Sequence, residues 1–187
     1  MRKLLFGLMA LVSLLVMPYS ALAAEGQSAV SENDVQVERA GTSFRVALSI
    51  YVPVAPSLAW SVMSDFDHMA EFLPDLNSSQ VTEHSDNLLK VKQKGVARYG
   101  LFSSRFESIR EIRLTPQSEI RAHGVGGNIE RMESVMQLHT ESGGTRLTYH
   151  AEVTPGFWFP PFIGPALVRH QTAEQFSAMV QEMKRRQ

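Results

Sequence analysis

Gln93 is the first of several polar side chains that could perform chemistry on an otherwise apolar surface. It shares the alternation of Leu89 and Val91 in a stretch that reads as a β-strand, so its amide is expected to face inward. There the amide could hydrogen-bond a ligand's carbonyl group. Alternatively, it could face the open end of the sheet and meet water.

Arg169 and His170 lie in a C-terminal stretch whose apolar residues recur at helical spacing. Arg169 falls within the apolar stripe and His170 at its margin. An unpaired buried guanidinium is costly, so Arg169 must contact a carboxylate, a ligand or water. Its aliphatic part could instead pack while the charged group extends to solvent. His170 fits either a histidine at the edge of the core or a general base.

A further group of candidate ligand contacts is apolar or aromatic. Inward alternation on two strands, the apolar helical stripe and the segment 154–168 supply them. Methionines suit an adaptable pocket wall, although ordinary core packing explains them nearly as well. These candidates are Met132, Met136, Tyr149, Trp158, Phe162 and Phe176.

The segment "TPGFWFPPFIGPALV" combines aromatic residues with prolines and cannot form a regular strand or helix. Phe157, Trp158 and Phe159 cannot all point inward on an extended chain, so at least one should be exposed or cover a cavity mouth. One hypothesis is therefore a cavity gate that also makes transient contact with membrane lipid. The other is a hydrophobic plug beneath a loop.

Common catalytic and metal-binding patterns are absent from the sequence. It contains no G-x-S-x-G, no H-E-x-x-H and no His-x-His, and its six histidines are scattered. Alternation places His139 and His150 on the solvent side of their strands. "GVGGN" lacks the helix that would follow a phosphate-binding loop, so a hairpin turn is expected there. The sequence therefore predicts neither a metal nor a cofactor, and it offers no clear acid/base pair.

The first 23 residues have the pattern of an export signal. Arg2 and Lys3 precede an apolar run, and Ala21-Leu22-Ala23 gives the small-x-small cleavage pattern. The alternative is an uncleaved anchor. We expect cleavage near Ala23, a periplasmic or secreted protein, and a polar linker over residues 24–42. No cysteine is present, so the exported domain must depend on its core alone.

Charge argues against nucleic acid as a partner. The chain has 18 basic and 19 acidic residues, and loss of Arg2 and Lys3 with the leader would make it more acidic. Hydrophobic residues make up 44% of the chain, which is typical of a globular protein.

The elements that must hold these candidates follow a simple order. A strand over 44–52 precedes two short helices over 56–64 and 66–73. Alternating stretches then predict six more strands, and a long amphipathic helix runs from Phe162 to Arg185. The predicted fold is α+β: a curved, seven-stranded antiparallel sheet covered by the long helix, with an apolar cavity between them. The six later strands are expected at 76–84, 87–97, 101–114, 118–125, 129–140 and 145–153.

The stretches "VPVAPSLAWSVMSDFDHMAEFLPDL" and "GGTRLTYHAEV", in this order before a long helix, resemble the START-like or SRPBCC helix-grip superfamily. The chain is most similar to its polyketide cyclase/dehydrase and coenzyme-Q-binding group, over residues 43–187. The resemblance implies a deep apolar cavity for a lipid, quinone or polyketide-like molecule. It leaves open a carrier, an aromatase/cyclase-type enzyme, or a module that docks a protein or membrane through residues 157–163. The export signal departs from the quinone-binding members.

Overall fold

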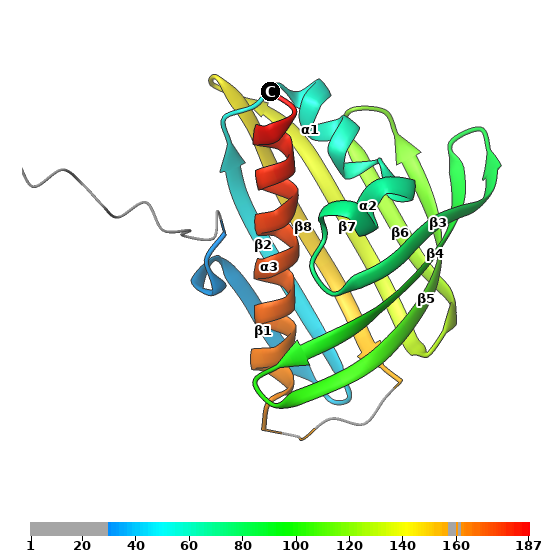
Figure 1. Cartoon of the computed structure of the whole chain (residues 1–187). Helices are drawn as coiled ribbons and strands as arrows, with labels where there is room; N and C mark the ends of the chain where they lie inside the picture. Colours follow the sequence, from blue (N-terminus) through cyan, green and yellow to red (C-terminus); the bar gives the residue numbers. More distant parts are fainter. Residues whose placement is uncertain (1–29, 157–159, 161) are drawn as a thin grey trace, which may run out of the picture.

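The computed structural model describes residues 30–156, 160 and 162–187. Its main feature is one antiparallel sheet, in which each strand pairs with its neighbour through a short turn, except where β2 joins β8. The sheet order is β1-β2-β8-β7-β6-β5-β4-β3, and α3 (Gly164–Arg185) lies along its concave face (Figure 1). The α+β fold with a C-terminal helix over a curved sheet agrees with the prediction. The strands are β1 (Val35–Ala40), β2 (Ser43–Val52), β3 (Leu76–Ser85), β4 (Leu88–Tyr99), β5 (Phe102–Thr115), β6 (Glu119–Gly127), β7 (Ile129–Glu141) and β8 (Gly144–Pro155).

The sheet has eight strands, not the seven that the sequence predicts. The additional strand β1 lies within residues 24–42, which read as a polar linker. It pairs antiparallel with β2, so that Val35 lies opposite Leu48. Only Val35 and Val37 mark its apolar side, and polar residues dominate the rest. Such a short alternation is a weak sequence signal for a strand.

The segment before β1 is also part of the folded unit. Val30 is buried, and its N–H donates to Ser177 Oγ at 3.0 Å. The same hydroxyl donates back to Val30 O at 3.1 Å. Ser31 and Asp34 then form a capping box around the short helix η1 (Glu32–Asp34). The chain is therefore attached to α3 before the first strand begins.

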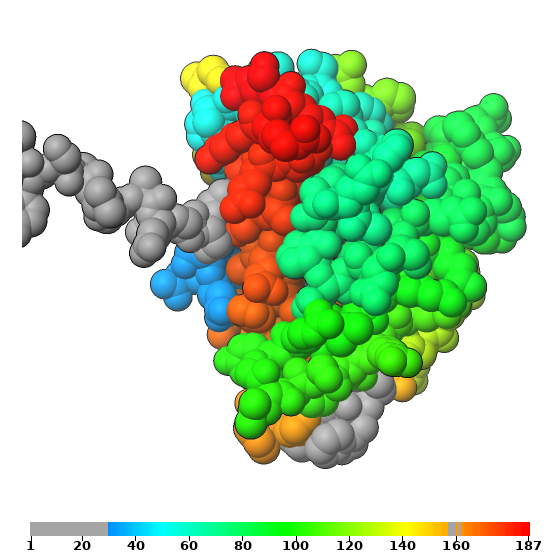
Figure 2. Space-filling view, viewed as in Figure 1, coloured from blue at the N-terminus to red at the C-terminus, as the bar shows by residue number. Residues whose placement is uncertain are grey.

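Three short helices follow β2 and cover the upper part of the sheet in Figure 1. They are α1 (Pro56–Met63), η2 (Phe66–His68) and α2 (Met69–Phe72). Pro56 fits the first turn of α1 because a helix leaves that N–H unpaired. In Figure 2, α3 runs between this group and the β1 segment on the visible face.

A bulge between β5 and β6 and a close approach on β4 are among the irregularities of the sheet. In the β5–β6 pair, Ile109 lies opposite Gly126 but Arg110 lies opposite Gly124, so Val125 is an extra residue. Such a bulge bends a strand and redirects its side chains. On β4, a Cβ at Gly95 would stand 2.7 Å from the Phe106 ring, so only glycine lets that ring lie across the strand.

The C-terminal end of α3 is fixed by charged groups. Buried Glu182 accepts hydrogen bonds from Arg185 Nε at 2.7 Å and from Arg186 Nε at 2.6 Å. Arg186 also pairs with Asp65, whose carboxylate bonds His68 Nδ1 at 2.6 Å. This cluster joins the helix to the chain between α1 and η2.

Candidate functional site

A cavity lies between the concave face of the sheet and α3, as the sequence predicts. It has two adjoining compartments, an outer one of about 200 Å³ and an inner one of about 120 Å³. Together their volumes lie just inside the lower end of the range of about 300–1,000 Å³ for small-molecule sites. The residues that border both compartments are Leu73, Gln93, Arg110, Met132, Tyr149 and Gln175.

The two compartments differ in position. The outer one reaches Leu167 and Val168 near the start of α3, and Pro155 at the end of β8. The inner one extends beneath Met63 and Met69, under the short helices. Apolar side chains make most of both walls, so the cavity suits a hydrophobic molecule.

Arg110 is the one permanently charged residue that borders both compartments within the described part of the chain. It points inward from β5, on the same side as Ser108 and Ile112, which are buried. Its guanidinium donates to Gln93 Oε1 through Nη2. Its Nε is buried and has no hydrogen-bond partner among the described residues. Burial lowers the pKa of Arg110, although an arginine stays protonated at neutral pH.

Gln93 is held so that its oxygen faces Arg110. Its Nε2 donates to Ser79 Oγ at 2.9 Å, and Ser79 in turn donates to Phe66 O. Nε2 also lies 3.6 Å from the Met69 sulfur. Because this chain of bonds occupies the amide nitrogen, the amide oxygen is the group left for Arg110.

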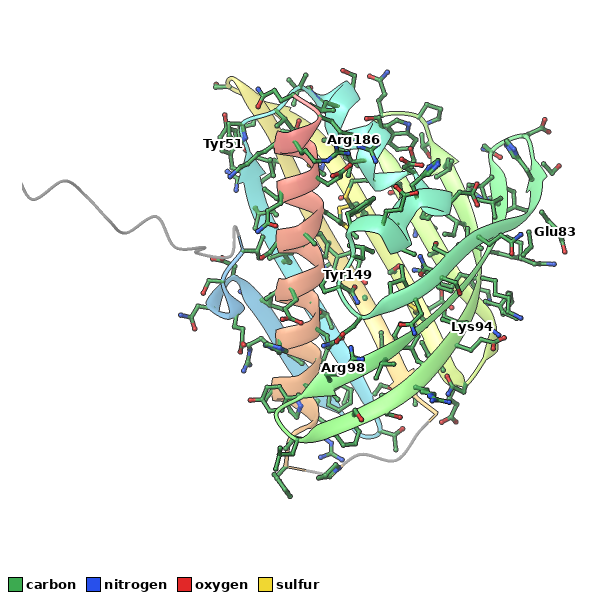
Figure 3. All side chains as sticks on the ribbon, in the orientation of Figure 1. Tyr51, Glu83, Lys94, Arg98, Tyr149 and Arg186 are labelled. Carbon is green, nitrogen blue, oxygen red and sulfur yellow. The ribbon has the colours of Figure 1, made fainter. Side chains whose placement is uncertain are left out.

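Tyr149 supplies a second polar group to the same region. It extends from β8 between the sheet and α3, where Figure 3 labels it. Its ring packs against Phe176, with centroids 5.1 Å apart, and its hydroxyl bonds Ser134. Burial raises the pKa of Tyr149 despite the nearby Arg110. The phenol is therefore protonated at neutral pH and can donate a hydrogen bond.

The structure brings together five of the candidates predicted from the sequence. Gln93 and Tyr149 border both compartments, and Met132 does so as well; Met136 and Phe176 line the inner one. That these residues contact a ligand stays a prediction. Trp158 lies outside the described residues.

Three other candidates do not line this cavity. Phe162 is 85% exposed. Arg169 donates from Nε to Val35 O at 3.3 Å, so it packs on β1. His170 faces the molecule's exterior, where Nδ1 lies 2.9 Å from Glu32 and Nε2 lies 3.4 Å from Glu174. The prediction for Arg169 was incomplete because its partner belongs to the strand that the sequence did not reveal.

Sequence reasoning missed Arg110, although the signal was present. In "FESIREIRL", Arg110 shares the alternation of Phe106, Ile112 and Leu114. An arginine among inward-facing apolar residues of a strand is the same kind of pattern that identified Gln93.

Other hollows of the described chain lie on its outer side and are bordered by charged residues. One of them, of about 400 Å³, is lined by Glu38, Arg45, Glu133 and Glu152 among others. Among the described residues, no cluster of three His, Asp or Glu could hold a metal ion. Within the same part of the chain, no helix is long and apolar enough to cross a membrane.

The curved sheet, the C-terminal helix over it and the cavity between them define a START-like protein of the helix-grip type. The family model described as "Polyketide cyclase / dehydrase and lipid transport" matches residues 52–180, more than half of the sequence. The chain belongs to this family. No curated protein matches it significantly in sequence.

Solved structures share this fold at low sequence identity. The Zhui aromatase/cyclase from Streptomyces aligns with a TM-score of 0.66 and 15% identity, over 77% of this chain and 95% of that one. A STAR-related lipid transfer protein from Xanthomonas axonopodis aligns with a TM-score of 0.63 and 13% identity, over 81% and 99% of the two chains. A START superfamily protein from Mycobacterium smegmatis gives 0.65 and 11%, over 76% and 99%. The fold is thus related to that of both lipid transfer proteins and aromatase/cyclases.

Proposed function

We propose that this protein binds a hydrophobic small molecule, non-covalently, in the cavity between the sheet and α3. The observation that carries the proposal is an apolar cavity whose two compartments meet at Arg110, whose Nε is buried and has no hydrogen-bond partner among the described residues. A hydrophobic ligand would pack against the apolar walls, and a polar group on it could accept a hydrogen bond from the buried Nε of Arg110.

The polar groups of the cavity support binding more strongly than catalysis. Tyr149 has a raised pKa and is a donor, not a base. His170, the predicted alternative base, pairs with Glu32 on the exterior. Arg110, which Gln93 orients, is suited to hold a ligand's acceptor atoms.

A cavity-filling variant tests this function. Thr172 lies on α3 and lines the outer compartment, so Thr172→Phe would occupy space meant for the ligand. Gln181→Phe adds the same ring at an exposed position of the helix and serves as the control. We expect the neutral dye Nile red to fluoresce with the wild type and with Gln181→Phe, but much less with Thr172→Phe. Equal fluorescence with all three proteins would place the dye elsewhere and count against the cavity.

We also propose that the end of the molecule where α3 begins makes transient contact with membranes. Phe162 is 85% exposed there, and Leu101 is fully exposed at the turn between β4 and β5. Gln171 Nε2 donates to Arg98 O at 3.0 Å, which holds this turn near the outer compartment. The aromatic residues 157–159, predicted to take part, lie outside the described residues.

Vesicle sedimentation tests the membrane contact. The variant Leu101→Asp/Phe162→Asp should remain in the supernatant when the wild type sediments with phosphatidylcholine vesicles. Tyr51→Ser is the control, because Tyr51 is exposed at the opposite end of the molecule from Arg98 (Figure 3). Equal sedimentation of the double variant and the wild type would show that this end makes no such contact.

Export is the remaining part of the proposal, supported by the leader-like first 23 residues. N-terminal sequencing of protein from the periplasm or medium should begin near Ala24. Retention of Met1 in that fraction would show that the segment is not cleaved.

A further inference from the structure

We propose that the ligand is an amphiphile with a single carboxylate, and that Arg110 binds this carboxylate where the two compartments meet. This inference rests on the proposed function and names the chemical class of its ligand. It is carried by the guanidinium's surroundings, which supply hydrogen-bond acceptors for only part of it.

The charge of the cavity favours an anion. Among the described lining residues, Arg110 and Asp75 carry permanent charge, and Asp75 forms an ion pair with Arg98. No described carboxylate is paired with Arg110, whose electrostatic neighbour is the neutral Tyr149. A sterol, quinone or ester would leave the guanidinium charge without a counter-ion in an apolar enclosure, which is costly. An anionic ligand would balance it.

One guanidinium can balance one negative charge, so the anion should be monovalent. A carboxylate matches the planar fork of arginine donors and can accept two parallel hydrogen bonds. A phosphate monoester would retain a second charge with no cation in the described lining to meet it. The carboxylate is thus the group that this cavity fits best.

The neighbours of Arg110 orient it for this role. Gln93 accepts from Nη2, and its amide is itself fixed by Ser79. Most of the five guanidinium N–H groups remain without a protein partner in the described chain. Tyr149 stands beside them with a protonated hydroxyl that can donate as well. Gln93 therefore acts as a positioning residue, and Arg110 and Tyr149 would contact the ligand.

The hydrocarbon part has room on either side of this point. The outer compartment leads toward the start of α3, and the inner one ends beneath the short helices. Water is the competing partner for the free N–H groups, and an uncharged ligand would leave them hydrated. If a carboxylate binds Arg110, the head group should contribute strongly to the affinity. If water meets the N–H groups instead, acid and alcohol should bind about equally.

Calorimetric titration with decanoic acid and decan-1-ol at pH 8 tests whether the carboxylate contributes to binding. The two probes share a chain length and differ in the head group. The wild type should bind the acid about 10-fold to 100-fold more tightly, as expected for hydrogen bonds to charged groups. Arg110→Met should bring the ratio to about 1, whereas Arg113→Met, at an exposed site on the same strand, should preserve it.

The outcomes distinguish the inference from the function beneath it. Equal affinity of the wild type for acid and alcohol would overturn the carboxylate assignment and leave the proposed function standing. Tighter binding of decyl phosphate than of decanoic acid would also overturn it. Failure of the acid, the alcohol and Nile red alike to bind would reject the proposed function itself. The comparison in the wild type needs no variant, so it holds even if Arg110→Met does not fold.

Discussion

At the scale of single residues, Arg110 and Glu182 are two charged side chains of the folded interior that differ in their hydrogen-bond partners. Glu182 receives hydrogen bonds from Arg185 and Arg186 and needs no further partner. Arg110 donates to one amide oxygen, that of Gln93, and to no carboxylate among the described residues. The first charge holds elements together, and the second is available for binding.

Gln93→Glu would supply Arg110 with an internal counter-ion at nearly unchanged volume. The new carboxylate would occupy the donors that the ligand's carboxylate needs. We expect decanoic acid to bind about 10-fold or more weakly than to the wild type, a change of about 1.4 kcal/mol or more, while decan-1-ol affinity stays within about 2-fold. Calorimetry measures both. Undiminished acid affinity in Gln93→Glu would mean that Arg110 does not hold the acid.

At the scale of elements, α3 closes the cavity and is attached at several points along its length. Ser177 bonds the chain at Val30, Arg169 bonds β1, and Glu182 joins the C-terminal cluster. Figure 3 places Arg186 at the end of α3 that lies away from Arg98. On another side of the same helix, Leu167, Val168, Gln171, Thr172 and Gln175 face the outer compartment.

The C-terminal cluster predicts an acid-sensitive attachment of α3. Hydrogen bonds from Arg185, and then from Arg186, lower the pKa of Glu182 to about 2, against the effect of burial. A carboxyl whose folded pKa is lower than its unfolded value of about 4.5 stabilises the fold at higher pH. Its contribution is complete well above pH 4.5 and is lost as the pH falls toward about 2.

Glu182→Gln should therefore be less stable than the wild type at pH 7, by about 1.5–3 kcal/mol, the range for hydrogen bonds to charged groups. The difference should shrink as the pH falls from about 4.5 toward 2. Urea unfolding across this pH range measures it, with Glu130→Gln at an exposed site of β7 as the control. A difference that stayed constant with pH would show that the Glu182 charge does not stabilise the folded state.

At the scale of the whole molecule, the order of elements could be predicted because apolar and polar residues alternate along the strands, and apolar residues recur at helical spacing in α3. Seven strands and the long helix follow from it, and so do the inward directions of Gln93 and Met136. Two valines were too weak a signal to predict β1. The contact of Arg169 with Val35 O could not be predicted either, because Val35 belongs to that strand.

The cavity's size and chemistry depend on features that alternation does not describe. The bulge at Val125 and the close approach of Phe106 to Gly95 are three-dimensional relations between strands. Arg110 had a visible signal, but that no described carboxylate pairs with it is known only once every neighbouring strand is in place. Sequence patterns therefore gave the directions of side chains more reliably than their partners.

Native mass spectrometry tests the central claim most directly, after the protein is incubated with a lipid extract of its host cells. We expect one bound small molecule per wild-type chain and per Gln181→Phe chain, and none on Thr172→Phe, whose added ring fills the outer compartment. Organic extraction of the wild-type complex should release a hydrophobic compound. Wild-type protein that carries no bound molecule, or a molecule that Thr172→Phe retains equally well, would contradict a ligand site between the sheet and α3.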